Sequence, residues 1–456
     1  MRPSASVPKP FVRRAVYPLK EAVLRRRTLA IAAELGQSER LSRDELLELQ
    51  TERFGRILRH AYEHVPYYRR LFDSRGLSPE DIRSPADLPR LPILTKEIIR
   101  RHRDELTVSA RPGSYVQMQY TSGSTGEPVA VPGDALELST HLANQLRGRA
   151  WHGIEVGDDE VRVWHDPRLY ARSTLSSRLF WSANAAKDRL LNIRMVAAAD
   201  LSEAELLHWE RTLCRSRPRV LYGYAASIFC FARYLGTRAA PPPRVETVIV
   251  TAEKILPAQK ELIAEVFGAR VLEEYGSAEV GVIAFECPSG GLHTSDESLV
   301  LELAETGPDG AGELLVTSLS NRVMPLIRYR IGDVVAVARE PCGCGRALGR
   351  LEQVVGRTTD YLLDAGGAAV HPFSLMLPIQ RLPSIERYRV VQTGVGTVEL
   401  HVQAARDLTD GETAAVRAAF ADALGDGTAV AIRRFRTLPP GPRGKHRFLT
   451  SHLGSA

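Results

Sequence analysis

The chain has 456 residues, too many for one ordinary hydrophobic core, so two or three domains are expected. Its composition, 44% hydrophobic and 25% charged, is that of a globular protein, and no apolar run is long enough to cross a bilayer. The net charge of +6 is small for this length; it does not indicate nucleic-acid binding, and it suits anionic small molecules such as nucleotides. The basic N-terminus lacks the apolar segment of a secretory signal, so we expect a cytoplasmic protein.

The first part of the chain, from residue 15 to about 110, is predicted to be mainly helical. Within it, Ser42–Glu45 reads "SRDE", a capping box that opens a segment with an apolar residue at every third or fourth position. From about residue 113, short apolar segments alternate with helices and with Gly and Pro turns, and a second N-cap signal, "SEAE", begins at Ser202. This alternation predicts an α/β fold with part of its sheet parallel.

The second half of the chain is predicted to contain most of the strands. Residues 245–255 indicate a buried strand, followed by a helix that ends at Gly268 and by another strand. The segments "SLVLELA", "GELLVTSLS" and "GDVVAVARE" then predict consecutive strands. Beyond Asp360 the pattern strand, strand, helix, strand predicts a small α+β domain, which ends in a Gly- and Pro-rich loop.

The segment "YTSGSTGEP", residues 120–128, concentrates small and hydroxylated residues. It is not a P-loop, because Glu127 follows its last glycine where that motif has lysine. Nor is it the dinucleotide fingerprint G-x-G-x-x-G, because its only glycines, 123 and 126, lie three apart. Its backbone amides and hydroxyls nevertheless suit a phosphate. The alternative interpretation is a plain turn between two strands.

Five motifs in order along the chain resemble the signature motifs of the adenylate-forming enzymes, the superfamily of acyl-CoA synthetases, adenylation domains and luciferases. They are "YTSGSTGEP", "EEYGSAEVG", "RYRIGDVV", "GRTTD" and "PRGKHR". Three further segments, "ILRHAYEHVPYYRRLF", "NRVMPLIRYRIGD" and "PCGCGR", are typical of the phenylacetate-CoA ligase family, including its members tied to capsule biosynthesis. The resemblance covers nearly the whole chain. It implies a helical N-terminal segment (1–112), an adenylation core (113–358) and a small mobile C-terminal α+β domain (359–456).

The resemblance also implies the reaction and its residues. A carboxylic acid would be activated by ATP and Mg²⁺ as an acyl-adenylate, with release of pyrophosphate. The cradle for the β- and γ-phosphates would be Thr121, Ser122, Gly123, Ser124, Thr125 and Gly126. At the nucleotide, Tyr275 would stack on the adenine and Asp333 would accept from both ribose hydroxyls, together with Glu253, Gly276 and Ser277.

The implied catalytic residues are Glu279, which would hold Mg²⁺, Arg357 on the ribose or phosphate side, and Lys445 on the α-phosphate. Lysine is rare here, with seven lysines against 53 arginines, so Lys445 in its motif is informative. The implied hinge of the C-terminal domain is Thr359 and Asp360, although Asp is usual where Thr359 stands. Glu127 and Ala278 also depart from the usual pattern, in which a lysine and a hydroxyl residue stand at these positions.

The acyl pocket is expected among Tyr222, Gly223, Tyr224 and Ala252, whose tyrosines are compatible with an aryl or arylacetic acid. The expected acceptor is coenzyme A, which makes the protein an AMP-forming acid–thiol ligase. One alternative is transfer to an amine or to a carrier protein. Another is a non-catalytic nucleotide-binding or assembly role, against which the retention of the motif residues argues. A homodimer is plausible from the family.

Three of the five cysteines and one histidine lie in two turn-rich segments, "CPSGGLH" and "PCGCG". Their side chains, Cys287, His293, Cys342 and Cys344, make the three-thiolate, one-imidazole set of a structural zinc site, as in some relatives of this branch. The alternative is a set of incidental surface thiols. Cys214 and Cys230 are expected to be ordinary buried thiols.

Overall fold

The structure is a computed structural model. It describes residues 6–108, 116–120, 129–164, 184–198, 201–304, 306, 310–357, 362–364, 369–370, 379, 382, 384–438 and 449–451. Within these ranges no helix has the length and apolar character needed to cross a membrane. The chain forms two compact units: unit 1 comprises Met1–Ser6, Asp159–Leu272 and Val355–Ala456, and unit 2 comprises Val7–Asp158 and Glu273–Val354.

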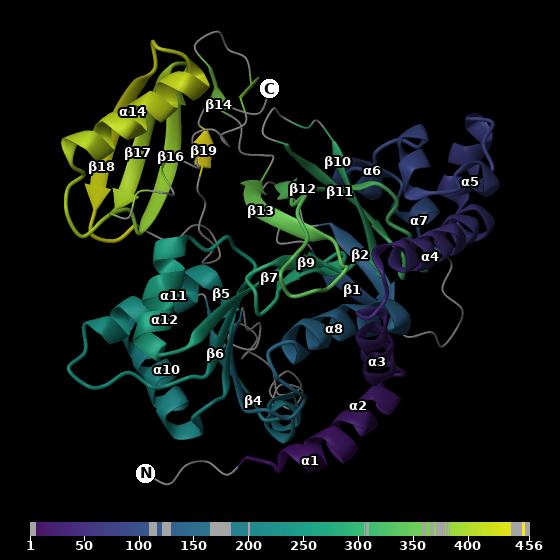
Figure 1. Cartoon of the computed structure of the whole chain (residues 1–456), viewed down its shortest axis with the longest axis horizontal. Helices are drawn as coiled ribbons and strands as arrows, with labels where there is room; N and C mark the ends of the chain where they lie inside the picture. The colour runs from purple at the N-terminus through teal and green to yellow at the C-terminus, as the bar shows by residue number, and fades with distance from the viewer. Residues whose placement is uncertain are drawn as a thin grey trace. The chain divides into compact units, whose positions relative to one another are not determined.

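The first half of unit 2 is helical, as predicted, and appears in purple and blue in Figure 1. Its helices are α1 (Lys9–Phe11), η1 (Val12–Val16), α2 (Tyr17–Val23), α3 (Thr28–Ser38), α4 (Arg43–His64), α5 (Pro66–Ser74), η2 (Pro79–Asp81), η3 (Pro85–Arg90), α6 (Lys96–Arg101), α7 (Arg103–Leu106) and α8 (Ala135–Ala150). Helix α4 begins at the predicted capping box, in which the Ser42 side chain accepts from the Glu45 amide. Its buried side chains, including Phe54, Ile57, Leu58 and Ala61, follow the helical period.

The rest of unit 2 is an antiparallel sheet in the order β10-β11-β12-β13-β9-β8-β7. Its strands are β7 (Arg270–Ser277), β8 (Gly281–Glu286), β9 (Leu292–Thr294), β10 (Leu299–Ala304), β11 (Ala311–Ser318), β12 (Tyr329–Val337) and β13 (Arg350–Arg357). Strands β10, β11 and β12 pair in succession, which confirms the predicted consecutive strands. A separate pair, β1 (Val116–Tyr120) and β2 (Ala130–Asp134), holds the two ends of the predicted phosphate loop side by side.

Unit 1 contains a parallel sheet covered by helices. Its strands are β3 (Glu160–Trp164), β4 (Ile193–Ala197), β5 (Val220–Tyr224) and β6 (Thr247–Thr251), and its helices are α10 (Glu203–Ser216), α11 (Ala225–Gly236) and α12 (Pro257–Phe267). Strand β3 pairs in parallel with β4 and β5, and β5 pairs in parallel with β6. The helices pack their apolar faces on the sheet through buried side chains such as Trp209, Phe231 and Phe267. Helix α12 ends as predicted, with Gly268 in the left-handed region.

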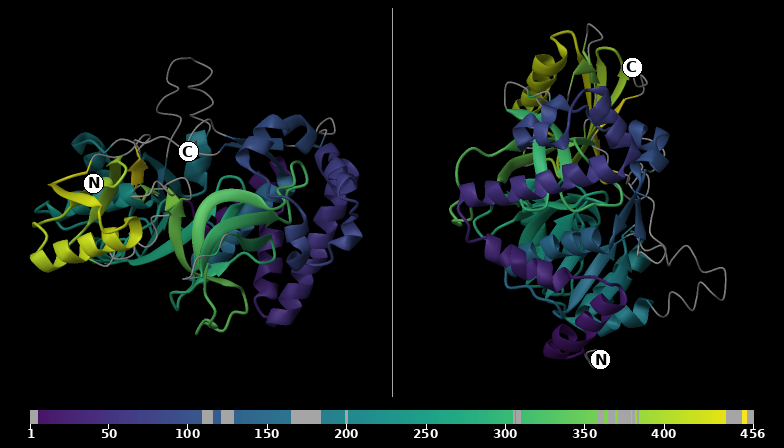
Figure 2. Two further views of the ribbon diagram at one scale, coloured as in Figure 1. Left: turned by 90° about the horizontal axis from the view of Figure 1, so that it is seen from above. Right: turned by 90° about the vertical axis from the view of Figure 1, so that its right-hand side faces the viewer.

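The C-terminal part of unit 1 forms a small α+β layer. Its elements are β14 (Leu362–Leu363), β15 (Ala369–Val370), β16 (Arg387–Gly394), β17 (Thr397–Gln403), α14 (Asp410–Leu424), β18 (Ala429–Phe435) and β19 (Leu449–Ser451). The sheet order is β18-β17-β16-β19, and α14 covers one face of it, seen in yellow in Figures 1 and 2. Val416 and Phe420 of the helix pack with Val390 and Val398 of the sheet. This arrangement confirms the predicted α/β fold with a small α+β tail.

Candidate functional site

The motif "EEYGSAEVG" forms β7, a tight turn and the start of β8, and two glycines shape that turn. The pairing of β7 with β8 shifts register between Tyr275 and Gly276. A Cβ at Gly276 would lie 2.4 Å from the backbone oxygen of Gly281, so only glycine fits there. Gly281 has a φ of +72°, and its Cβ would lie 2.4 Å from the ring of His141 on α8. The turn therefore requires these glycines.

Two of the predicted nucleotide residues are in direct contact. The Tyr275 hydroxyl on β7 donates a hydrogen bond to Asp333 Oδ2 on β12, over 2.8 Å. Asp333 follows Gly332, whose φ of +89° turns the chain within the strand, and its side chain is buried. Because 58 residues separate the two partners, the sheet order brings them together and local sequence does not.

The other two polar residues of the motif lie in the turn. Glu279 is buried, and its Oε1 accepts a hydrogen bond of 3.0 Å from the hydroxyl of Tyr329, which is fully buried on β12. The buried Ser277 hydroxyl has no hydrogen-bond partner among the residues that the structure describes. Buried polar atoms are usually paired, so Ser277 has the hydrogen-bonding capacity that a ligand would fill. A carboxylate oxygen such as those of Glu279 is the ligand type that Mg²⁺ prefers.

In unit 1, the predicted acyl-pocket tyrosines form an aromatic cluster with a residue that sequence reasoning missed. Tyr222 stacks on Trp164 with ring centroids 5.6 Å apart, and the Tyr224 ring lies 4.8 Å from Trp164. The three side chains stand at the carboxyl ends of β3 and β5, the edge where ligands bind in open parallel sheets. Trp164 could have been found from its place as the last residue of the apolar strand segment "EVRVW".

The remaining predicted residues of unit 1 either shape the backbone or contact it. A Cβ at Gly223 would lie 2.1 Å from the Val163 carbonyl oxygen, so this glycine allows β3 and β5 to approach. Ala252, just after β6, has a φ of +66°, an unusual conformation for a residue with a side chain. The adjacent Glu253 carboxylate accepts a 3.0 Å hydrogen bond from the Ala226 amide, which caps the start of α11.

Several predicted residues lie outside the described part of the chain. They are the phosphate loop (121–126), the hinge residues Thr359 and Asp360, and Lys445. The backbone of Arg357 ends β13, but its side chain is not described. Their roles stay predictions.

The four predicted metal ligands of unit 2 lie together. The ligand atoms of Cys287, His293, Cys342 and Cys344 are all within 4.8 Å of one another, and all five cysteines of the chain are free thiols. The expectation that Cys214 is buried is wrong, because Cys214 lies off the buried face of α10 and is exposed. Cys287 Sγ is 3.6 Å from Cys342 Sγ, close to the ~3.8 Å between two sulfurs of a tetrahedral zinc site with bonds of about 2.3 Å. A Cβ at Gly291 would lie 2.7 Å from Cys342 Sγ, so glycine lets the two loops close on the cluster.

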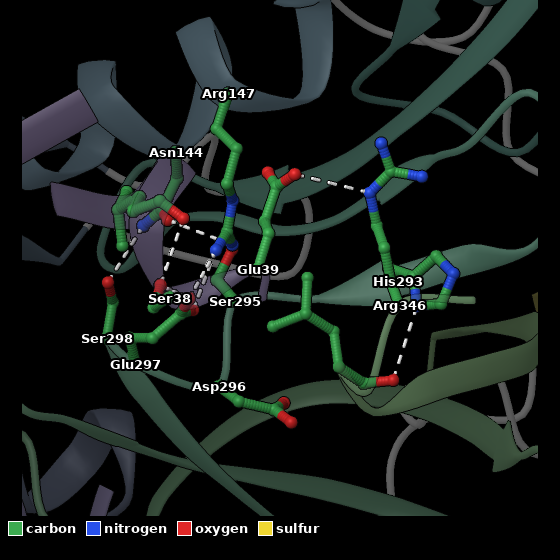
Figure 3. Close-up of polar contacts among 12 residues, drawn as sticks. Ser38, Glu39, Asn144, Arg147, His293, Ser295, Asp296, Glu297, Ser298 and Arg346 are labelled. Carbon is green, nitrogen blue, oxygen red and sulfur yellow. Dashed lines mark hydrogen bonds and ion pairs between the residues drawn. The ribbon is translucent and has the colours of Figure 1, made fainter. Parts of the chain in front are cut away.

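A second layer of contacts orients the histidine. His293 Nδ1 lies 3.3 Å from the Leu348 carbonyl oxygen (Figure 3). This leaves Nε2 facing Cys344 Sγ at 3.1 Å. The edge of the His293 ring packs against Trp151, at the C-terminal end of α8, with centroids 5.9 Å apart. Such a hydrogen bond on the second ring nitrogen is the usual way in which proteins fix a metal-binding histidine.

The cysteines of the cluster differ in acidity. Burial raises the pKa of Cys287 to about 11. Burial acts in the same direction on Cys344, but hydrogen bonds from Arg346 and Cys342 and the charge of His293 lower its pKa to about 6. The cluster offers three sulfur donors and an imidazole, a donor set that fits Zn²⁺.

The loop that follows His293 is held by a buried ion pair. Arg147 on α8 contacts both oxygens of Glu297, over 2.7 and 2.8 Å, and Ser38 donates to the same carboxylate (Figure 3). The Asp296 carboxylate accepts a 2.7 Å hydrogen bond from the Gly349 amide. This bond joins the loop to the segment that follows Cys342 and Cys344. The loops that carry the cluster are thus tied to α3 and α8.

Comparison with known proteins gives consistent relatives, although no protein-family model matches the chain. It is 27% identical over 374 residues to a phenylacetate-coenzyme A ligase of Thermus thermophilus, covering 79% of this chain and 81% of that protein. It is 23% identical to Protein CapK of Staphylococcus aureus, covering 90% of both. It is also 29% identical over 148 residues, 32% of this chain, to an indoleacetate–lysine synthetase of Pseudomonas savastanoi.

Among solved structures, a 2-hydroxyisobutyryl-CoA ligase in the postadenylation state shares the fold, with a TM-score of 0.71 over 91% of both chains and 19% identity. The same fold is found in an open conformation of that ligase, with a TM-score of 0.61. The ordered motifs, the mixed α/β architecture and these relatives agree. The chain is therefore similar over most of its length to the phenylacetate-coenzyme A ligases and to Protein CapK, and it shares the fold of a CoA ligase.

Proposed function

We propose that the protein activates a carboxylic acid with ATP and transfers the acyl group to coenzyme A. In the first step a carboxylate oxygen of the acid attacks the α-phosphorus of ATP, and the bond to pyrophosphate breaks. In the second step the thiolate sulfur attacks the acyl carbon, the bond to AMP breaks, and the thiol proton passes to solvent. Relatives named phenylacetate-coenzyme A ligase support this assignment. The observation that carries it is the hydrogen bond between Tyr275 and Asp333, which joins two superfamily motifs.

The residues of unit 2 would bind the nucleotide. Asp333, held by Tyr275, would accept from both ribose hydroxyls, because a carboxylate only accepts hydrogen bonds. The Tyr275 ring would stack on the adenine. The unpartnered Ser277 hydroxyl would donate to the α-phosphate, which would partly replace the hydroxyl that Ala278 lacks.

The phosphates require positive charge. Mg²⁺, when bound, neutralises the developing charge on the leaving pyrophosphate. Glu279 would hold it, and its buried carboxylate is already oriented by Tyr329. The cradle (121–126), Arg357 and Lys445 would supply the remaining amides and cations, and Thr359 and Asp360 would form the hinge on which Lys445 moves. Glu253 would border the nucleotide while it caps α11.

The acyl group would lie against the aromatic cluster of unit 1. Trp164, Tyr222 and Tyr224 present rings at the carboxyl ends of neighbouring strands, which suits a flat aryl or arylacetic acid. Gly223 and Ala252 would contribute backbone to the same wall.

A second acceptor class has one specific observation in its favour. Part of the chain is similar to an enzyme named as an indoleacetate–lysine synthetase, whose acceptor is an amine. The alternative function is therefore an adenylating enzyme that passes its acyl group to an amine or a carrier protein.

The test is release of AMP and pyrophosphate from Mg-ATP with a panel of aryl, arylacetic, fatty and hydroxy acids, each with and without coenzyme A. We expect acid-dependent release that increases with coenzyme A, together with an acyl-CoA product detected by mass spectrometry. Acid-dependent release that coenzyme A leaves unchanged would favour the amine or carrier protein. No acid-dependent AMP with any acceptor would contradict the proposal.

We further propose that Cys287, His293, Cys342 and Cys344 hold a structural Zn²⁺ that pins two loops together, with no part in the chemistry. The predicted outcome is about one zinc per chain by elemental analysis. Cys344→Ser should lose the zinc and lower the midpoint of thermal unfolding, whereas Cys214→Ser, at an exposed cysteine outside the cluster, should do neither. Zinc retained at full occupancy in Cys344→Ser would refute the site.

A further inference from the structure

The first helix of the described chain exposes apolar side chains along one side. Elements α1, η1 and α2 follow one another without a break from Lys9 to Val23 (Figure 1). Phe11 is 56% exposed, Leu19 67% and Val23 74%. Seven large hydrophobic side chains are exposed in the described residues, and three of them lie on this helix at intervals of one or two turns.

The opposite side of the helix is anchored to unit 2. Val12 and Tyr17 are buried, and the π-helical turn η1 places these two residues, five apart, on the same side. Val12 packs against Gly157, where a Cβ would lie 3.1 Å away. Lys9 pairs with Asp158 at 2.7 Å. Because these contacts fix the rotation of the helix, its apolar stripe faces outward.

Most charges beside the stripe are positive. Arg13, Arg14, Arg25 and Arg27 are exposed. The one carboxylate between residues 9 and 27 is Glu21, which is buried. Two carboxylates of neighbouring elements lie close, since Arg13 pairs with Glu155 at 2.9 Å and Arg27 lies 4.0 Å from Glu34. The exposed side of this segment therefore combines apolar tips with an excess of arginines.

We propose that this segment, residues 9–27, docks the protein on an anionic membrane surface. A helix that places Phe and Leu side chains on one line, flanked by arginines, lies in the headgroup layer with its apolar tips in the acyl boundary. Arginine side chains extend from that depth to the lipid phosphates. The attraction falls off within a Debye length, so docking is sensitive to salt.

The same features argue against a second copy of the chain as the occupant. A two-fold contact through this helix would place its exposed arginines against those of the partner, and like charges at an interface are costly. The stripe also presents single side chains one or two turns apart on a convex helix, which matches a flat lipid surface better than a pocket on a protein.

The test is cosedimentation of the full chain with vesicles of phosphatidylcholine, with and without phosphatidylglycerol. We expect binding to the vesicles that contain phosphatidylglycerol and its loss in about 0.5 M NaCl. The variant Phe11→Ser/Leu19→Ser/Val23→Ser should bind more than about tenfold more weakly, because the apolar tips no longer enter the lipid. Arg14→Glu/Arg27→Glu should weaken binding by at least about 25-fold.

Two matched control variants test whether vesicle binding is specific to this surface. Leu47→Ser/Val337→Ser/Val395→Ser removes three other exposed apolar side chains, and Arg417→Glu/Arg436→Glu makes the same change of charge elsewhere. Both should bind as the parent does, and circular dichroism checks that all variants fold. No binding of the parent to anionic vesicles, or equal losses in the controls, would overturn the proposal. A dimer that the apolar triple variant converts to a monomer would assign the surface to a second copy and overturn it as well.

Discussion

At the scale of single residues, the hydrogen bond between Tyr275 and Asp333 makes the sharpest prediction for catalysis. Asp333→Asn should reduce kcat/KM for ATP by about 100-fold, because an amide cannot accept both ribose hydroxyls as a carboxylate does. Tyr275→Phe keeps the ring and removes only the hydroxyl, so its loss should be about tenfold or less. Steady-state kinetics with saturating acid measures both. Equal activity of Asp333→Asn and the parent would show that Asp333 does not bind the nucleotide.

The glycine at the end of the motif turn makes a prediction about folding. Gly281→Ala forces a Cβ against the His141 ring at a positive φ, and should destabilise unit 2 by about 2–3 kcal/mol. Gly310→Ala is the matched control, since its φ is +76° with no atom near the added Cβ, so it should cost only about 1 kcal/mol. Denaturant unfolding compares the two. Similar losses in both variants would mean that the contact with His141 is not tight.

Sequence reasoning named candidate residues of the site but not the residues that they contact in the structure. The motifs predicted Tyr275, Glu279 and Asp333, and the cysteine spacing predicted the cluster that the structure brings together. The role of Tyr329 as the donor to Glu279, 50 residues away, depends on the order of strands in the sheet. The stacking of Trp164 on Tyr222 depends on parallel pairing of β3 and β5. Neither contact has a local signature.

At the scale of elements, the buried pair of Arg147 and Glu297 links α8 to the loop between β9 and β10. Glu297→Gln should lower the free energy of unfolding by about 3–5 kcal/mol near neutral pH, because it leaves the Arg147 charge buried without its partner. Urea denaturation measures this loss. The exposed Glu340→Gln is the control and should change little.

The same pair predicts a pH dependence. Burial opposes ionisation of Glu297, but the Arg147 charge and the hydrogen bonds from Ser38 and Arg147 hold its pKa below the usual glutamate value. A lowered pKa stabilises the fold fully above the ordinary value of 4.5, and this contribution is lost as the pH falls through the folded value. Stability of the parent should therefore fall below pH 4.5 more steeply than that of Glu297→Gln. Parallel curves would contradict the assignment.

Elements with strong local signals were predicted well. The capping box at Ser42, the N-cap at Ser202 and the terminating Gly268 are all confirmed, because each depends on a few adjacent residues. The strand expected in residues 245–255 is shorter, Thr247–Thr251, because Ala252 turns the chain with a positive φ. Neither that turn nor the π-helical turn η1 contains a residue, such as glycine, from which the sequence would predict it.

At the scale of the whole molecule, compact units are assembled from segments far apart in the sequence. Unit 1 joins Asp159–Leu272 with Val355–Ala456, and the chain between them belongs to unit 2. Linear composition contains little information on such groupings, because they are set by long-range packing. The expected division into 1–112, 113–358 and 359–456 is a different kind of division, based on motifs, and it stays a prediction.

The proposed movement of the C-terminal domain makes a prediction that separates the two half-reactions. Lys445→Ala should slow acyl-adenylate formation by about 100-fold or more, because the α-phosphate loses a point charge in the transition state. Transfer from a supplied acyl-adenylate to coenzyme A should be little changed, since Lys445 would have withdrawn by then. Lys187→Ala, at an exposed lysine outside the motifs, controls for loss of a positive charge. Equal slowing of both half-reactions would contradict the proposed movement.

The central claim, formation of an acyl-adenylate, is tested most directly by exchange of labelled pyrophosphate into ATP without coenzyme A. Exchange reports reversal of the first step alone, so it does not depend on the identity of the acceptor. We predict exchange that requires an acid from the aryl or arylacetic group, requires Mg²⁺ and is lost in Lys445→Ala. Exchange that no acid stimulates, in a folded protein that binds ATP, would contradict it.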